Sequence, residues 1–286
     1  MKHTEIIYQG KSYQSADCIR SIPTVTSIKG FDVEMAKEDP HIPPVIKQKL
    51  GPTRIFSYRG ANLPPSIETY HHVSELAKII RYMGARQHIH APTTIVDVGT
   101  GSGLAIISLA NELHDYCKNN QGVRLIATDI SGLALEVADL NAQVNRVDDI
   151  NFRKRDVLNG LVAEFGKIDV IMCNPPFFES SAIDQRLKRI DYVPIGAIDG
   201  GTDGLEFYRK LFIQSNDALS DEGVLLVQHQ AHQLVSVASL TAQYLPGRES
   251  VALRRSKNGQ TASLIGSPKL VSELSNQGMS TPISTI

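Results

Sequence analysis

A glycine-rich turn between an apolar run and a helical segment constrains this chain more than any other feature. Ile95-Val96-Asp97-Val98 is typical of a buried strand, residues 99–103 contain three glycines, and residues 104–114 have helical apolar spacing. Glycine allows a tight turn and a close approach of the backbone to a ligand. In open α/β sheets, ligands bind beyond the carboxyl ends of the strands. This order predicts an α/β domain with a ligand site at the turn.

Further strand-like and helical segments alternate after this turn. The strand-like runs are residues 123–128, 150–156, 168–173 and 223–228, and the helical runs are residues 131–145, 204–219 and 231–244. Such alternation predicts right-handed crossovers and a doubly wound, mostly parallel sheet. Asn258-Gly259 lies between the strand-like residues 251–255 and 261–265, which predicts an antiparallel hairpin. We therefore expect a Rossmann-like α/β fold with seven strands that ends in an antiparallel C-terminal hairpin.

The two ends of the chain differ from this central region. Residues 1–90 are interrupted by prolines, and we expect them to form a smaller N-terminal region that recognises substrate or acts as a lid. The catalytic domain is expected over residues 91–266, and a flexible tail over residues 267–286. Local patterns within the ends predict a hairpin turning at Gly10, short helices at residues 33–37 and 45–50, a longer helix at 67–83, and one helical turn at 270–274.

Composition excludes several classes of protein. The 286 residues carry a net charge of −1, so the overall charge does not indicate a nucleic-acid partner. Cys18, Cys117 and Cys173 lie far apart, which disfavours a disulfide framework or a zinc site. No apolar run approaches the roughly 20 residues of a membrane span. We expect a cytoplasmic protein with no metal and no membrane association.

Several residues near the predicted strand ends suit a nucleoside cofactor. The turn has G-x-G-x-G spacing after an acid rather than the dinucleotide G-x-G-x-x-G, so an NAD-linked oxidoreductase is disfavoured. Asp129 ends the second strand, where a carboxylate accepts both ribose hydroxyls, and Asp156 with Val157 follows the third, where a carboxylate can accept from an adenine amino group. The expected cofactor-binding residues are Asp97, Gly99, Thr100, Gly101, Ser102, Gly103, Asp129, Asp156, Val157 and Asn174.

The segment Asn174-Pro175-Pro176-Phe177-Phe178, here named the reaction loop, directly follows the fourth strand. Two prolines restrict its backbone, so the Asn174 side chain and the Pro175 carbonyl have defined directions. Each can accept one N–H of a planar amide or amine, and the Phe177 ring can stack on that group. We expect Asn174, Pro175 and Phe177 to be catalytic, and Asn174, Pro175, Pro176 and Phe177 to bind substrate.

Together these motifs resemble the class I methyltransferases that carry an N-P-P-Y/F motif. Within that group, Asp199-Gly200-Gly201-Thr202-Asp203-Gly204-Leu205-Glu206-Phe207-Tyr208 is similar to the D-G-G-x-D-G-L-x-x-Y stretch of HemK-like protein-glutamine N5-methyltransferases. The resemblance covers roughly residues 93–266. It implies S-adenosyl-L-methionine as cofactor, a protein glutamine amide as methyl acceptor, and a peptide-release factor as the partner.

Other acceptors and other classes stay open. This chain has Phe177 where HemK-like enzymes usually have Tyr, and Pro65-Ser66-Ile67-Glu68-Thr69 only partly matches their P-R-P-E-T-E segment. The reaction loop with Arg186 and Arg189 downstream also resembles adenine-N6 methyltransferases that act on RNA. A small-molecule N-methyltransferase and a non-catalytic binding module are further alternatives. His229 follows the fifth strand, and we expect a structural rather than a catalytic histidine there.

Overall fold

The computed structural model describes residues 5–8, 11–14, 45–58, 61–63, 66–119, 122–187, 193–253 and 260–282. The predicted helix at residues 33–37 and Arg189 lie outside these ranges. The strands are β1 (Glu5–Tyr8), β2 (Lys11–Gln14), β3 (Val45–Leu50), β4 (Thr53–Tyr58), β5 (Thr93–Val98), β6 (Val123–Asp129), β7 (Ile150–Lys154), β8 (Ile168–Cys173), β9 (Leu219–Gln230), β10 (Glu249–Ala252), β11 (Gln260–Gly266) and β12 (Thr281–Pro282). The helices are α2 (Ile67–Ala85), α3 (Leu104–Glu112), α4 (His114–Asn119), α5 (Gly132–Asn145), α6 (Leu161–Phe165), α7 (Ser180–Leu187), α8 (Glu206–Ala218), α9 (Leu234–Tyr244) and α10 (Pro268–Asn276), with short 3₁₀ turns η3 (Ile195–Ala197) and η4 (Ala231–Gln233).

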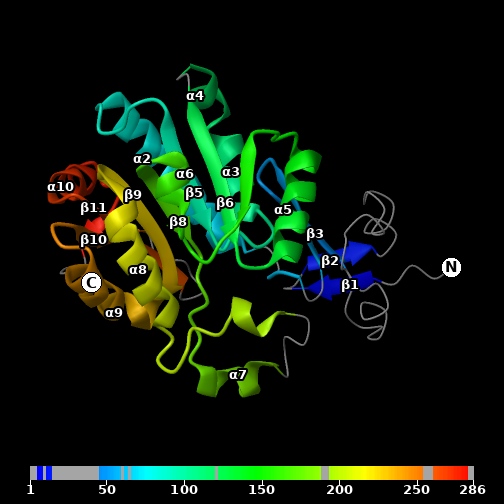
Figure 1. The fold of residues 1–286 in the computed structure, drawn as a ribbon. Helices are drawn as coiled ribbons and strands as arrows, with labels where there is room; N and C mark the ends of the chain where they lie inside the picture. The colour runs from blue at the N-terminus through cyan, green and yellow to red at the C-terminus, as the bar shows by residue number, and fades with distance from the viewer. Residues whose placement is uncertain are drawn as a thin grey trace.

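One twisted sheet organises the molecule (Figure 1). Its strand order is β12-β10-β11-β9-β8-β5-β6-β7, and the neighbours from β7 to β9 are parallel. Strand β11 is antiparallel to both β9 and β10, which confirms the predicted C-terminal hairpin. The seven expected strands are present, and the two-residue β12 extends the edge by pairing with β10. The chain reverses direction across the sheet between β5 and β8, which creates a topological switch point.

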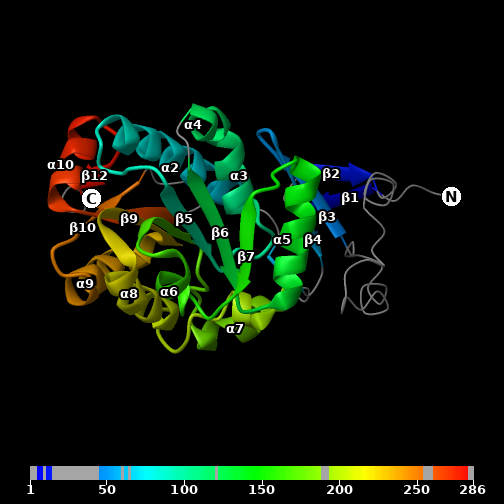
Figure 2. The same ribbon diagram turned by 45° about the horizontal axis from the view of Figure 1, so that its top comes forward.

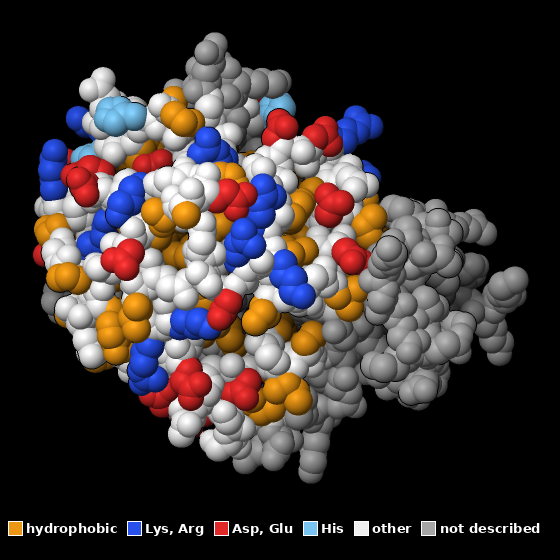
Figure 3. All heavy atoms as spheres, in the orientation of Figure 1, with side chains coloured by type: hydrophobic (Ala, Val, Ile, Leu, Met, Phe, Trp, Pro, Cys, Tyr) orange, Lys and Arg blue, Asp and Glu red, His pale blue; other side chains and the backbone are white. Residues whose placement is uncertain are grey.

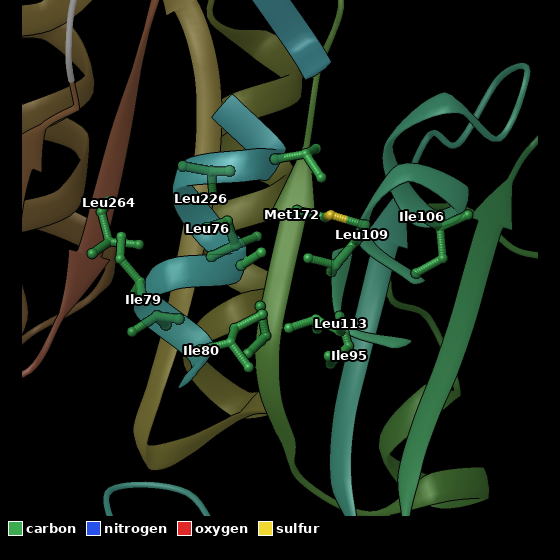
Figure 4. Packing of buried hydrophobic residues seen from close by; sticks show 14 of the residues in the cluster. Leu76, Ile79, Ile80, Ile95, Ile106, Leu109, Leu113, Met172, Leu226 and Leu264 are labelled. Atoms are coloured by element: carbon green, nitrogen blue, oxygen red, sulfur yellow. The ribbon is translucent and has the colours of Figure 1, made fainter. Parts of the chain in front are cut away.

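The sheet separates two apolar layers, because successive side chains of a strand point to opposite faces. Ile95 joins a buried cluster with α2 and α3, whereas Val96 and Val98 join a second cluster with α8 and α9. Figure 2 shows α2, α3 and α4 on one side of the sheet and α6, α8 and α9 on the other. In the first layer, Leu76 and other α2 side chains lie against β8, β9 and β11, as Figure 4 shows. All six residues of β5 are buried, as expected for a strand that is covered on both faces.

The predicted helix at residues 45–50 is wrong, because this segment is strand β3. It pairs with β4 in antiparallel register from Val45 opposite Tyr58 to Leu50 opposite Thr53, with a turn at Gly51 that has a φ of 56°. A strand partner supplies the backbone hydrogen bonds that an isolated six-residue helix would have to make alone. The predicted hairpin around Gly10 is confirmed by the pairing of β1 with β2.

The N-terminal hairpin β3–β4 is joined to the main domain by two asparagine side chains of α5. Asn141 accepts from Phe56 N at 2.9 Å and donates to Phe56 O at 2.8 Å, and Asn145 makes the same pair of bonds with Arg54. Each side-chain amide therefore satisfies one donor and one acceptor on the outer edge of β4, as a neighbouring strand would. Asn141 also donates to Ser102 O at 2.8 Å, so it links the hairpin to the glycine-rich turn.

The segment predicted to be a flexible tail is ordered over residues 267–282. The Ser267 side chain accepts from Leu270 N and begins α10, and Leu270, Val271 and Leu274 are buried. Their spacing places three apolar side chains on one helical face, which packs on the layer formed by α2 and the sheet. The expectation of a tail overlooked this short amphipathic helix, and the single predicted helical turn is a helix of nine residues.

Element boundaries differ in smaller ways from the sequence prediction. The predicted helix at residues 104–114 is interrupted at Leu113, and α4 continues beyond it. The fifth strand of the parallel part begins earlier than expected, at Leu219, and the helix after it opens with the 3₁₀ turn η4. Among the described residues, none of the helices combines the length and the apolar character that crossing a membrane requires.

Replacing Leu274 by alanine tests the role of α10. Leu274 is fully buried, and we expect Leu274→Ala to lower the free energy of unfolding by about 2–4 kcal/mol, because it leaves a cavity in a packed layer. The measurement is chemical denaturation, with Ser272→Ala on the exposed side of the same helix as the control. Equal stability of the two variants would show that the segment behaves as a loose tail.

Candidate active site

The carboxyl ends of β5, β6, β7 and β8 open into one cavity of about 1290 Å³. The switch point between β5 and β8 lies at its base, where the α/β rule places a ligand. Nearly all predicted site residues line this cavity: Asp97, Gly99, Thr100, Gly101, Ser102, Asp129, Asp156, Val157, Asn174, Pro175, Pro176 and Phe177. The structure therefore brings together residues that are spread over 81 positions of the sequence. Gly103 is the one predicted site residue that does not line the cavity.

Residues 99–103, here named the glycine loop, form an open cradle at the end of β5. Gly99 and Gly101 have φ values of 67° and 56°, a region that L side chains rarely adopt. A Cβ atom at Gly99 would meet nothing within 4 Å, so the space beside this backbone is free for a ligand. Thr100 N donates to Thr128 O at 2.9 Å, which fixes the loop to β6.

Gly103 has a structural role that differs from that of Gly99 and Gly101. It has a φ of 78° and is the residue from which α3 begins. A Cβ atom there would lie 3.1 Å from Ala138 Cβ on α5 and 2.9 Å from Ile107. The absent side chain therefore allows α3 and α5 to pack closely behind the cradle.

Asp97 is a buried acid in the wall of the cavity, and only 2% of it is exposed. Its Oδ2 accepts from Thr100 Oγ1 at 2.7 Å. Burial raises the pKa of Asp97 to about 7, and the nearby charge of Asp129 adds to this effect, although hydrogen bonds oppose it. A cation placed beside this buried carboxyl group would stabilise its ionised form.

Asp129 joins the end of β6 to the glycine loop. Its Oδ2 accepts from Gly101 N at 3.0 Å, and its Oδ1 accepts from Ser131 N at 2.9 Å. Burial raises the pKa of Asp129, and these backbone donors oppose the shift. Each carboxylate oxygen keeps a second lone pair, so hydroxyl groups of a ligand can still donate to it. The next residue, Ile130, lines the cavity with 70% of its surface exposed, an apolar contact that the sequence analysis did not identify.

Asp156, after β7, lines the cavity with a cation beside it. Its Oδ2 forms an ion pair with Lys210 Nζ from α8, and about half of each side chain is exposed. Lys210 also lines the cavity. No local pattern predicts this pair, since the two residues are 54 positions apart.

The reaction loop is braced by residues 198–204, here named the bracing segment. Phe178 N donates to Ile198 O at 3.0 Å, Gly200 N donates to Phe178 O at 2.8 Å, and Ser180 N donates to Gly201 O at 2.9 Å. These bonds form a short parallel bridge between the two segments. The rings of Phe177 and Phe178 pack edge to face with centroids 4.7 Å apart.

Two glycines of the bracing segment allow its close contact with the reaction loop. A Cβ atom at Gly200 would lie 2.9 Å from Pro176 O, and one at Gly204 would lie 2.6 Å from Phe177 O. Gly204 also has a φ of 70°. Both positions exclude a side chain because the two backbones touch, which gives a physical reason for the D-G-G-x-D-G pattern. At the end of the same stretch, the buried Tyr208 hydroxyl donates to Gln228 O at 2.9 Å and ties α8 to β9.

The N-terminal region, which was expected to recognise substrate or act as a lid, contributes a wall of the cavity whose individual residues the sequence analysis did not name. The lining residues are Ala61, Asn62, Leu63, Ser66, Glu68 and Thr69. Leu63 O accepts from Ser57 Oγ at 3.1 Å, and Thr69 Oγ1 donates to the Gln228 side chain at 3.1 Å. The start of α2 at this wall could have been predicted from the sequence, because Ser66 precedes an apolar helical pattern and caps the N-terminus of α2.

His229 lies outside the cavity lining and is fully buried. Its Nδ1 contacts Gln230 O and its Nε2 contacts Ser263 Oγ, each at 2.9 Å. Burial lowers the pKa of His229 to about 4, so the ring is neutral near pH 7. Both ring nitrogens are already engaged, which fits the structural role expected from the sequence. No group of three His, Cys, Asp or Glu side chains that could hold a metal ion occurs among the described residues.

Comparisons with known proteins agree with this architecture. Residues 85–190 match the Methyltransferase small domain family. The chain is similar to the release factor glutamine methyltransferase of Bacillus subtilis, with 28% identity over 223 residues, 78% of this chain and 74% of that protein. The enzyme of the same description from Clostridium acetobutylicum is 30% identical over 148 residues, 51% of this chain. The chain spans only half the length of that second relative.

A solved structure shares the fold. The hMettl16 catalytic domain in complex with a MAT2A 3′UTR hairpin superposes with a TM-score of 0.54 and 18% identity, covering 72% of each chain. This similarity concerns the arrangement of strands and helices. The chain has the Rossmann-like fold of class I methyltransferases, residues 85–190 match a methyltransferase family, and the chain is similar to HemK-like glutamine methyltransferases; S-adenosylmethionine is the cofactor that this similarity indicates.

Proposed function

We propose that this protein transfers the methyl group of S-adenosylmethionine to a planar nitrogen, and that the acceptor is a glutamine amide of a protein. The observation that carries the proposal is the reaction loop itself. The bracing segment holds it beside the glycine loop, at the wall of one shared cavity. Its amide and carbonyl acceptors suit a nitrogen that has two hydrogens to donate.

The cavity has the groups that a sulfonium nucleoside requires. The cradle at Gly99 and Gly101 admits close backbone contact, Asp129 accepts ribose hydroxyls, and Asp156 beside Val157 accepts from adenine. S-adenosylmethionine supplies an electrophilic methyl group on a positively charged sulfur. The acids in this wall, with their raised pKa values, favour a cationic ligand over a dinucleotide with its negative pyrophosphate.

The reaction loop supplies orientation rather than acid–base chemistry. The Asn174 Oδ1 and Pro175 carbonyl oxygens each accept one N–H of the acceptor amide, and the Phe177 ring stacks on its plane. The nitrogen forms a bond to the methyl carbon, the carbon–sulfur bond breaks, and its electron pair stays on sulfur. The nitrogen then loses one proton to solvent. Alignment of this kind can supply about 7–11 kcal/mol of the barrier reduction.

Charges around the cavity favour a protein acceptor over RNA. Arg153 and Arg155 both pair with Glu164, at 2.8 and 3.2 Å, and Lys210 pairs with Asp156. On the face drawn in Figure 3, Lys and Arg side chains lie among Asp and Glu side chains. Cations that are already paired attract phosphates weakly. The similarity to glutamine methyltransferases supports the same choice, and a release factor is the first partner to test.

We propose that the N-terminal region recognises the substrate as a fixed wall. The bonds of Asn141 and Asn145 hold the β3–β4 hairpin on α5, and Asn62 and Leu63 follow from it into the cavity. Helix α2 belongs to the main apolar layer, so the recognition wall and the catalytic domain share one core.

Replacing Asn174 by alanine tests the mechanism. We expect Asn174→Ala to reduce kcat at least about 100-fold, because one of the two acceptors that orient the nitrogen is lost. Calorimetry should still show measurable S-adenosylmethionine binding, weaker than in wild type by no more than the contact of Asn174 itself, since the glycine loop and its acids are untouched. The control is Asn216→Ala on the exposed face of α8. Turnover at the wild-type rate in Asn174→Ala contradicts the proposed mechanism.

The acceptor class is tested with labelled cofactor. We expect label in a release-factor peptide that contains glutamine, and none when that glutamine is replaced by asparagine or glutamate, because the chain length and the two N–H groups set the position of the nitrogen. Cell extract treated with protease or ribonuclease provides the wider survey. Label that is released by ribonuclease alone would replace the protein substrate with RNA.

Cofactor affinity should depend on pH through Asp97. A cationic ligand prefers the ionised carboxylate, so binding releases a proton while the pKa of the empty site is about 7. We expect the affinity for S-adenosylmethionine to rise about eightfold from pH 6 to pH 7.5. Titration calorimetry in buffers of different ionisation enthalpy measures both the affinity and the proton release.

Asp97→Asn is the control for this pH effect. It should bind the cofactor more weakly, with little change between pH 6 and pH 7.5. The pKa of Asp97 is higher in the folded protein than in the unfolded chain. Ionisation of Asp97 therefore lowers the free energy of unfolding progressively as the pH rises from about 4 to about 7. Asp97→Asn should therefore melt at a higher temperature than wild type at pH 8 in the absence of cofactor. A lower melting temperature there would contradict the raised pKa.

A further inference from the structure

Gln233 makes contacts that no part of the proposed chemistry uses. This residue ends the 3₁₀ turn η4 that follows β9, and 5% of it is exposed. Its Nε2 donates to Phe177 O at 3.1 Å and to Gly204 O at 3.2 Å. Its Oε1 accepts from Gln230 N at 3.1 Å. One side-chain amide therefore connects the reaction loop, the bracing segment and the end of β9.

Each of these contacts matches the chemistry of a primary amide. The two hydrogens of Nε2 serve two carbonyl oxygens, and the amide oxygen serves one backbone donor. Loss of the amide would remove the donor to the Phe177 carbonyl at a partly buried contact and the donor to the Gly204 carbonyl at a buried one. Glutamate cannot reproduce the pattern when ionised, because it only accepts.

We propose that Gln233 is the positioning residue of the reaction loop. It does not line the cavity, so it acts through Phe177 and not on the cofactor or the acceptor. Holding the Phe177 carbonyl fixes the residue whose ring stacks on the acceptor. The restricted backbone of Pro175 and Pro176 then passes this constraint to Asn174.

The packing around Gln233 agrees with a fixed rather than a loose contact. A Cβ atom at Gly204 would lie 3.1 Å from Gln233 Nε2 and 2.6 Å from Phe177 O. The absent side chain at Gly204 makes room for the amide between the two carbonyls. Gln230, which Gln233 holds through its backbone N–H, lines the cavity, so the same amide also sets the end of β9.

The first test compares Gln233→Met and Gln233→Glu with Gln143→Glu, the same chemical change on the exposed face of α5. With labelled S-adenosylmethionine and a glutamine-containing acceptor, we expect both Gln233 variants to lose about 10- to 100-fold in kcat at pH 8. The dissociation constant of S-adenosylmethionine should stay within about twofold of wild type. Gln143→Glu should keep wild-type kcat.

A pH profile separates positioning from a general loss of structure. A protonated glutamate at position 233 has one O–H, which can donate to one of the two carbonyls, and burial raises the pKa at which this proton is held. The kcat of Gln233→Glu relative to wild type should therefore rise at least about fivefold between pH 8 and pH 5.5. Gln233→Met has no such proton, and its ratio to wild type should stay constant.

The second test needs no acceptor and so does not depend on the proposed substrate. Hydrogen exchange of the cofactor-bound protein measures the protection of the Phe178 and Gly200 N–H groups, which join the reaction loop to the bracing segment, and of the Ser180 N–H just after the loop. We expect their protection to fall at least about tenfold in Gln233→Met and to persist in Gln143→Glu. If wild type methylates no glutamine peptide, the proposed function fails while this measurement still decides the role of Gln233.

Two results would overturn the inference. One is wild-type kcat together with wild-type protection of the reaction loop in Gln233→Met. The other is a parallel fall of kcat, cofactor affinity and melting temperature in both variants, with no recovery of Gln233→Glu at low pH. The second result would assign Gln233 to general stability.

Discussion

The close contact between two loop backbones is the constraint on which the active site depends. The reaction loop leaves β8 at the switch point of the sheet, and its residues line the cavity there. Two hydrogen bonds join Phe178 of the reaction loop to the bracing segment, and a third joins Ser180 just after the loop. Gly200 and Gly204 allow the carbonyls of Pro176 and Phe177 to touch this segment. Catalytic alignment needs a position that is fixed to a fraction of an ångström. Prolines restrict the loop from within, and the bracing segment restricts it from outside.

A second set of contacts fixes the β3–β4 hairpin to the domain that contains the reaction loop. Asn141 bonds both polar groups of Phe56 and also Ser102 O, so one side chain reaches the hairpin and the glycine loop together. A change in the hairpin position would therefore disturb the cradle of the cofactor. The coupling rests on hydrogen bonds: if either the hairpin or the glycine loop moved, the buried Asn141 amide could no longer bond all three of its backbone partners.

Sequence reasoning succeeded where the determining information is local. Strand β8 begins at Ile168 and ends at Cys173, as the apolar run indicates, and the glycine spacing placed the cradle correctly. It failed for Val45–Leu50, because the strand conformation there depends on pairing with β4, which Asn141 of α5 bonds in turn. Gln233 could not be found either, because its partner Phe177 is 56 residues away and no periodicity relates them.

Different elements line different parts of the cavity, which explains why the sequence motifs indicate a reaction more clearly than a substrate. Loops after β5, β6 and β7 line one part of the cavity, which in the proposed function holds the cofactor, and the reaction loop after β8 lines the part that would hold the planar nitrogen. The remaining wall comes from the start of α2 and the segment after β4, elements outside the cofactor motifs. Because that wall packs on the same core, its residues can vary in chemistry while the sheet and the reaction loop keep their geometry. If this wall recognises the substrate as proposed, the part of the cavity with the weakest sequence signature selects the molecule that carries the acceptor nitrogen.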